Sequence, residues 1–146
     1  GESPPASGAF FYDNSNMTIF TQRAFEEAFG KRFESTGEFL SAFKAKGCFL
    51  DDLSHDPVDR LDRDERERLL IGSVDGLAQR LTKANPDVVV IVLKKIACFV
   101  RAAAANADLH AAIYELPFPG NGHQGKYMAG MAAILRRHIE AAEIEK

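Results

Sequence analysis

Along most of the chain, apolar residues recur about every three to four positions, the spacing that gathers them on one face of a helix. This pattern predicts helices at residues 17–29, 36–46, 62–84, 96–106 and from 124 to the C-terminus. Local signals mark several of their ends. Asn16 and Asp62 are suited to cap helix starts, and Gly30 is suited to end the first helix.

Apolar runs without this spacing predict strands at Cys48–Leu50, at Val88–Val92 and within Leu109–Leu116. Val88–Val92 is a continuous, mostly β-branched run, typical of a central parallel strand covered on both faces. Because strands and helices alternate, we predict an α/β fold, a three-layer α/β/α sandwich with a short, mostly parallel central sheet. We expect residues 1–146 to form a single domain, with a further strand preceding residue 1.

Composition narrows the classes of function. The formal net charge of -3 argues against a broadly basic nucleic-acid coat protein, although a local basic groove is compatible with it. Cys48 and Cys98 lie in apolar runs, so we expect buried thiols in a reducing compartment, and they are too few for a four-cysteine metal site. With no membrane-length apolar run and no signal peptide, a cytoplasmic monomer is expected.

Four polar loops should follow the predicted strands, and the carboxyl ends of parallel strands converge on one crevice. These loops are residues 1–12, 51–56, 93–95 and 117–126. The first is a glycine- and proline-rich turn that carries Glu2 and leads into the aromatic run Phe10–Tyr12. A carboxylate beside an aromatic wall can hold a flat polar ligand such as a nucleobase. The alternative is a surface loop whose aromatic residues cap the core.

The second loop contains the acidic and histidine side chains. Asp52 can accept a hydrogen bond from a base or sugar, or can simply serve a turn. For its neighbour Asp51 the turn is the favoured interpretation. His55 and Asp56 can bind a metal ion together with these carboxylates, but such a cluster without distant partners is weak evidence for a site.

The other two loops offer groups that suit phosphates. Lys94 and Lys95 can meet phosphates or can be a solvated pair. Asn121 and His123 can contact a phosphate oxygen, or can belong to a plain turn. The sequence contains no P-loop, nucleophile elbow or dinucleotide fingerprint.

Taken in this order, the motifs resemble those of the uracil-DNA glycosylase superfamily. The opening Gly-Glu-Ser-Pro-Pro is similar to the family's first motif, Gly-polar-x-Pro-Gly, whose second residue activates water and is glutamate in the iron–sulfur branch. Residues 87–103 resemble the third strand and its following helix, and Leu116–Asn121 resembles the second motif. The departures are Pro5 for the last glycine, Leu116 for the usual histidine and the absence of iron–sulfur cysteines.

The resemblance implies hydrolysis of the N-glycosidic bond of a deaminated or damaged base in DNA, with no metal or cofactor. Glu2 would be the catalytic residue, and Phe11 would stack on the base, with Phe10 or Tyr12 as the alternative. Asp52 stands where the family has an asparagine, and a carboxylate favours a base that presents donors. The implied phosphate contacts are Asn121, His123, Lys126 and Lys94.

Two alternatives stay open. One is a protein of the same fold that binds a nucleotide or nucleic acid without cleaving it. The other is a metal-dependent phosphohydrolase that uses Asp51, Asp52, His55 and Asp56.

Overall fold

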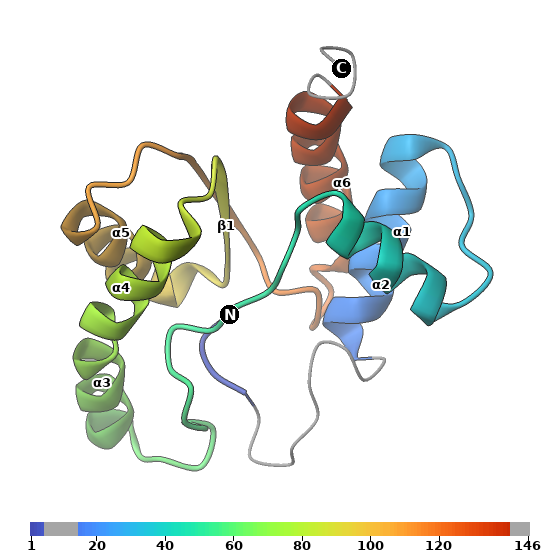
Figure 1. Cartoon of the computed structure of the whole chain (residues 1–146). Helices are drawn as coiled ribbons and strands as arrows, with labels where there is room; N and C mark the ends of the chain where they lie inside the picture. The colour runs from blue at the N-terminus through green and yellow to red at the C-terminus, as the bar shows by residue number, and fades with distance from the viewer. Residues whose placement is uncertain (5–14, 141–146) are drawn as a thin grey trace. The chain divides into compact units, whose positions relative to one another are not determined.

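The computed structural model describes residues 1–4 and 15–140, and these fall into two units, each built from two segments of the chain (Figure 1). The first unit comprises residues 1–4 and 51–115, and the second comprises 15–50 and 116–140.

The first unit contains all the strand pairing assigned among the described residues. Its helices are α3 (Arg63–Gly72), α4 (Val74–Ala84), α5 (Ala97–Asn106) and the short 3-10 helix η1 (Lys94–Ile96). Its strands are β1 (Val88–Val92) and β2 (Ala112–Leu116), and the last residue of β2 is the first of the second unit's second segment. The two strands pair in parallel and are connected through α5. The fold is therefore mixed α/β, as predicted, with a sheet of two strands within the described residues.

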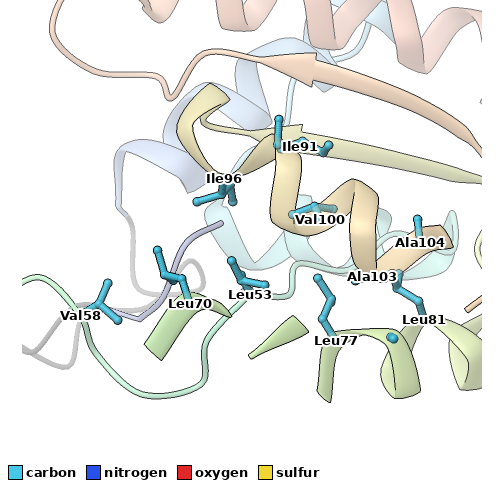
Figure 2. Close-up of a cluster of buried hydrophobic side chains, with 12 residues drawn as sticks. Leu53, Val58, Leu70, Leu77, Leu81, Ile91, Ile96, Val100, Ala103 and Ala104 are labelled. Atoms are coloured by element: carbon cyan, nitrogen blue, oxygen red, sulfur yellow. The ribbon is translucent and has the colours of Figure 1, made fainter. Parts of the chain in front are cut away.

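One apolar core holds this unit together (Figure 2). Ala103 and Ala104 are almost fully buried, and their small side chains let α5 approach α4 closely. Figure 2 shows Leu77 and Leu81 of α4 directed toward α5. Loop 51–62 contributes further buried side chains to the same core, so this loop is fixed by burial as well as by hydrogen bonds.

Strand β1 is less covered than its sequence predicts. Ile91 is buried in the core, and Val92 is buried as well, but the residues from Val88 to Val90 are only half-buried. The expectation of a strand covered on both faces is confirmed only at its carboxyl end. That end leads directly into the candidate site.

The predicted helix at 62–84 is two helices, α3 and α4, divided at Ser73. Asp62 caps the first, as predicted, by accepting a hydrogen bond from the Glu65 nitrogen at 2.8 Å. At the break, the Ser73 hydroxyl donates to the Leu69 carbonyl at 2.7 Å, and the Ser73 nitrogen donates to the Leu70 carbonyl. Apolar spacing continues across this point, which is why the pattern predicted a single helix.

The predicted strand at Cys48–Leu50 is wrong: the segment is irregular, and Phe49 is 60% exposed. The reason lies in the end of α2 (Thr36–Ala45). Gly47 has a φ of 77°, and the Cys48 nitrogen donates to the Phe43 carbonyl at 3.0 Å. The first backbone donor of the expected strand is therefore used to close the helix.

The second unit is helical within its described residues. It contains α1 (Asn16–Phe29), α2, α6 (Gln124–Leu135) and the π-helical turn η2 (Arg136–Glu140). Ser15, rather than Asn16, caps α1 by accepting from the Thr18 nitrogen, and Gly30 ends it in the left-handed conformation as predicted. Helix α1 packs on α6, while Phe25 at its buried face contacts the rings of Phe29, Phe39 and Phe43.

The expectation of two buried thiols is also corrected. Cys98 lies on the exposed side of α5, and Cys48 is half-buried. Burial raises the pKa of the Cys48 thiol above its ordinary value, more than nearby Lys46 lowers it.

A buried hydrogen bond connects α1 to α6. Tyr127 is fully buried, and its hydroxyl lies 2.6 Å from the hydroxyl of Thr21, which is 3% exposed. Burial raises the pKa of Tyr127 to about 12. Neither hydroxyl has access to water as a replacement partner.

We expect Tyr127→Phe to lower the free energy of unfolding by about 1–3 kcal/mol, because the Thr21 hydroxyl loses its buried partner. Urea denaturation at neutral pH measures this. Thr21→Val in the Tyr127→Phe background should cost less than Thr21→Val alone. Strict additivity of the two substitutions would contradict the assigned bond.

Candidate functional site

The site is built where residues 1–3 lie against loop 51–58. The Gly1 nitrogen donates to the Asp51 carbonyl at 2.8 Å, and the Leu53 nitrogen donates to the Gly1 carbonyl at 2.8 Å. This reciprocal pattern is one parallel β pair, with Gly1 opposite Asp52. The Ser54 nitrogen then donates to the Glu2 carbonyl at 2.9 Å. Two of the predicted loops therefore adjoin through their backbones.

The position of Asp52 depends on a glycine at residue 1. Its Oδ1 lies 3.4 Å from the Gly1 nitrogen, and a Cβ atom on residue 1 would lie only 2.5 Å from that oxygen. Any larger residue would therefore displace the carboxylate. The Asp52 side chain keeps 24% of its surface exposed, so it can still meet a ligand.

Arg80 of α4 fixes the loop by binding two acceptors at once. Its Nε donates to Asp51 Oδ2 at 2.7 Å, and its Nη2 donates to the Asp52 carbonyl at 2.7 Å. Asp51 Oδ1 accepts from the Asp52 nitrogen at 2.9 Å and lies 3.2 Å from His55 Nε2. Asp51 is thereby surrounded by structural partners, in line with the turn interpretation.

The pKa of Asp51 reflects these partners. Burial of the carboxyl acts to raise its pKa, but the hydrogen bonds from Arg80, His55 and the Asp52 amide outweigh it, and the pKa is lowered. The anchoring carboxylate is thus stabilised in its charged form.

Glu2 is the least satisfied acidic group of the site. Its side chain is 15% exposed, and Oε2 is buried and accepts no hydrogen bond from the described residues. The Lys95 Nζ lies 3.3 Å from this oxygen and forms an ion pair without hydrogen-bond geometry. Lys95 itself is 52% exposed. Glu2 therefore has a neighbouring positive charge but an acceptor that is still open.

Leu93, two residues before Lys95, has an unusual backbone conformation. Its φ of 119° and ψ of 108° lie in a region that residues with a Cβ rarely adopt, at a cost of about 1–3 kcal/mol. On either side, Val92 is 4% exposed and Ile96 is 1% exposed. The turn between β1 and α5 is therefore anchored at both ends by burial, and its strain lies two residues before the ion pair with Glu2.

The loop before α6 is a tight turn in the second unit. Asn121 and Gly122 have φ values of 52° and 86°, and the His123 nitrogen donates to the Gly120 carbonyl at 3.0 Å. Two consecutive positive φ angles with this bond are typical of a type I′ turn. Asn121, His123 and the following Lys126 are all exposed.

The other predicted site residues are Lys94, Phe11 and Tyr12. Lys94 is exposed and precedes Lys95 in the first unit. Phe11 and Tyr12, the proposed stacking residues, lie outside the described residues. The structure thus brings together Glu2, Asp52 and the lysine turn.

Sequence reasoning missed Arg80 and did not single out Lys95. Arg80 stands in an amphipathic helix whose other charged residues are solvated, so nothing in the pattern distinguishes it. Lys95 was noted only with Lys94, because adjacent lysines after a strand are equivalent in sequence.

No family model, curated protein or solved structure matches the chain, so the resemblance to the glycosylase superfamily stays a prediction. Within residues 1–4 and 15–140, no three His, Cys, Asp or Glu side chains are grouped to hold a metal ion. Asp51, Asp52, His55 and Asp56, the residues considered for a phosphohydrolase, therefore do not form such a group. No helix in the described part of the chain has both the length and the apolar character to cross a membrane.

We expect Asp51→Asn to lower the free energy of unfolding at pH 7 by about 1–3 kcal/mol, because hydrogen bonds to a charged group are lost. The pKa of Asp51 is lowered from 3.8, so its ionised form stabilises the fold above that pH. The contribution disappears as pH falls through the lowered pKa. Urea denaturation between pH 7 and acid conditions should therefore show the parent and variant converging.

Asp56→Asn is the matched control, since Asp56 is an exposed carboxylate in the same loop. It should leave the difference from the parent small at every pH. A constant loss for Asp51→Asn across the whole range would contradict the assigned electrostatic role.

Proposed function

We propose that this protein is a DNA-glycosylase-like hydrolase that cleaves the N-glycosidic bond of a deaminated or damaged base. The supporting observation is the buried Oε2 of Glu2, which accepts no hydrogen bond from the described residues and lies beside the pair formed by Gly1 and Asp52. An acceptor of this kind is suited to hold and deprotonate a water molecule.

The proposed reaction uses few protein groups. The bond from C1′ to the base nitrogen breaks, and the sugar develops oxocarbenium character. Water adds its oxygen to C1′ while Glu2 accepts a proton, and the departing base takes up a proton from solvent. Asp52, which can only accept hydrogen bonds when ionised, would bind amino or ring N–H groups of the base.

The other roles remain predictions from the sequence: stacking by Phe11 or Tyr12, and phosphate contacts by Asn121, His123, Lys126 and Lys94. We further propose the three-layer sandwich as the complete fold. It is supported by the parallel pairing of β1 with β2 and by the separate parallel pair of Gly1 with Asp52.

A second candidate is a protein that binds a nucleotide or nucleic acid without cleaving it. The ion pair between Glu2 and Lys95 favours it, because a carboxylate held by a lysine is less available to polarise water. Base release separates the two candidates.

We expect Glu2→Gln to reduce base release by about 10²–10⁴-fold, because the amide cannot accept the proton of the attacking water. The measurement is release of free base from single- and double-stranded oligonucleotides that contain uracil, hypoxanthine or xanthine. Asp52 leads us to expect a preference for the base with more donors at its polar edge.

The matched control is Glu115→Gln. Glu115 is also a glutamate in an ion pair, with Arg101 at 2.8 Å, but it lies on β2 away from loop 51–58 in sequence and pairing. Its substitution should leave release unchanged. Undetectable release by a folded parent that binds the oligonucleotides would reject the hydrolase and support the binding protein.

A further inference from the structure

We propose that Lys95 binds a phosphodiester group of the ligand, and that Glu2 is only its resting partner. On binding, Lys95 moves from Glu2 to the phosphate and leaves the Glu2 carboxylate free. This inference rests on the proposed function in taking a nucleic acid as the ligand. It does not require that the protein releases a base.

The contact between the two side chains is suited to exchange. Lys95 Nζ lies 3.3 Å from Glu2 Oε2 without hydrogen-bond geometry, and half of the lysine side chain is exposed. Ion pairs that reach solvent contribute little to stability. A lysine ammonium is a compact charge on a flexible stem, and a phosphodiester offers it better acceptors than this contact does.

The turn that carries Lys95 confines any movement to a short segment. Val92 and Ile96 are buried, and the Ile96 nitrogen donates to the Leu93 carbonyl at 3.2 Å. Leu93 between them has its backbone in a disfavoured region. The backbone of the turn is therefore held at both ends, and the half-exposed Lys95 side chain is the part that can move.

When Lys95 moves away, the surroundings of Glu2 change more than those of any other group in the site. Its Oε2 is buried and accepts no hydrogen bond from the described residues. Without the lysine, this oxygen needs a donor, which a water molecule or a donor group of the ligand can supply. Phosphate binding and preparation of the carboxylate would thus be coupled through one side chain.

The test is a double-mutant cycle read by binding. Fluorescence anisotropy measures the affinity for a labelled single-stranded DNA about ten nucleotides long, at one fixed low salt concentration. Glu2→Gln should tighten binding about fivefold by releasing Lys95, and Lys95→Met should weaken it by a similar factor. The double variant should bind like Lys95→Met, because the gain from Glu2→Gln passes through Lys95.

Matched controls separate this coupling from general charge effects. Asp52→Asn removes one negative charge beside residue 1, and its effect should be unchanged by Lys95→Met. Lys94→Met removes the neighbouring positive charge and should leave the gain from Glu2→Gln intact. Lys95→Met should also reduce the slope of log affinity against log salt by about 0.7, the loss of one phosphate contact on single-stranded DNA. Lys95→Gln replaces Lys95→Met if the latter fails to fold.

Three results would overturn the proposal: no gain from Glu2→Gln, a gain that persists in the Lys95→Met background, or no binding by any variant. Base release is not part of this reading. Coupling between Glu2 and Lys95 without base release would reject the hydrolase and keep this inference. Base release without that coupling would support the hydrolase and reject this inference.

Discussion

The guanidinium of Arg80 is the group on which the arrangement of the first unit depends. It joins helix α4 to the Asp51 side chain and to the Asp52 carbonyl with two hydrogen bonds of 2.7 Å. The same loop residues pair with Gly1, so the N-terminal segment is held in place indirectly by α4. A lysine could not replace this arginine, because its single ammonium lacks the planar fork that spans two acceptors. The hydrogen bonds of Arg80 therefore have a structural role: they hold the loop on which the candidate site is built.

This bond also divides the acidic groups into two kinds. Asp51 accepts hydrogen bonds from several donors and serves as an anchor, whereas Glu2 keeps a buried oxygen that receives no hydrogen bond within the part of the chain that the structure describes. A short distance along the chain from its partner Lys95, Leu93 adopts a disfavoured backbone conformation. Folded proteins generally avoid both features, and where they persist they concentrate at functional sites. Both features occur next to the ion pair between Glu2 and Lys95, and this distinguishes the turn between β1 and α5 from an ordinary turn.

The sequence allowed most helices to be placed, because the signals are local: Asp62 accepts the predicted bond from the Glu65 nitrogen, and Gly30 ends α1 with a positive φ. The errors came where a local pattern was overridden. Three apolar residues at 48–50 resemble a strand, but the Cys48 nitrogen closes the preceding helix. In the site, residues 1–3 and loop 51–56 adjoin as expected, but through the backbone pair of Gly1 with Asp52, because the strand expected to end at Leu50 is not formed. The partners of Asp51 and Glu2 could not be predicted, since they depend on the rotation of α4 and on the backbone of one leucine.

The choice between Lys94 and Lys95 illustrates the limit most clearly. In the sequence they are equivalent, and the resemblance pointed to Lys94. Both lie in the 3-10 helix η1, in which successive side chains point about 120° apart, and Lys95 is the one that pairs with Glu2. Leu93 joins β1 to this helix, and its positive φ sets the direction in which the chain leaves the strand. The orientation of two adjacent charges thus depends in part on the backbone of an apolar residue. The backbone dihedral angles of one residue are not visible in the spacing of polar residues along the chain, so the sequence pattern could not distinguish the two lysines.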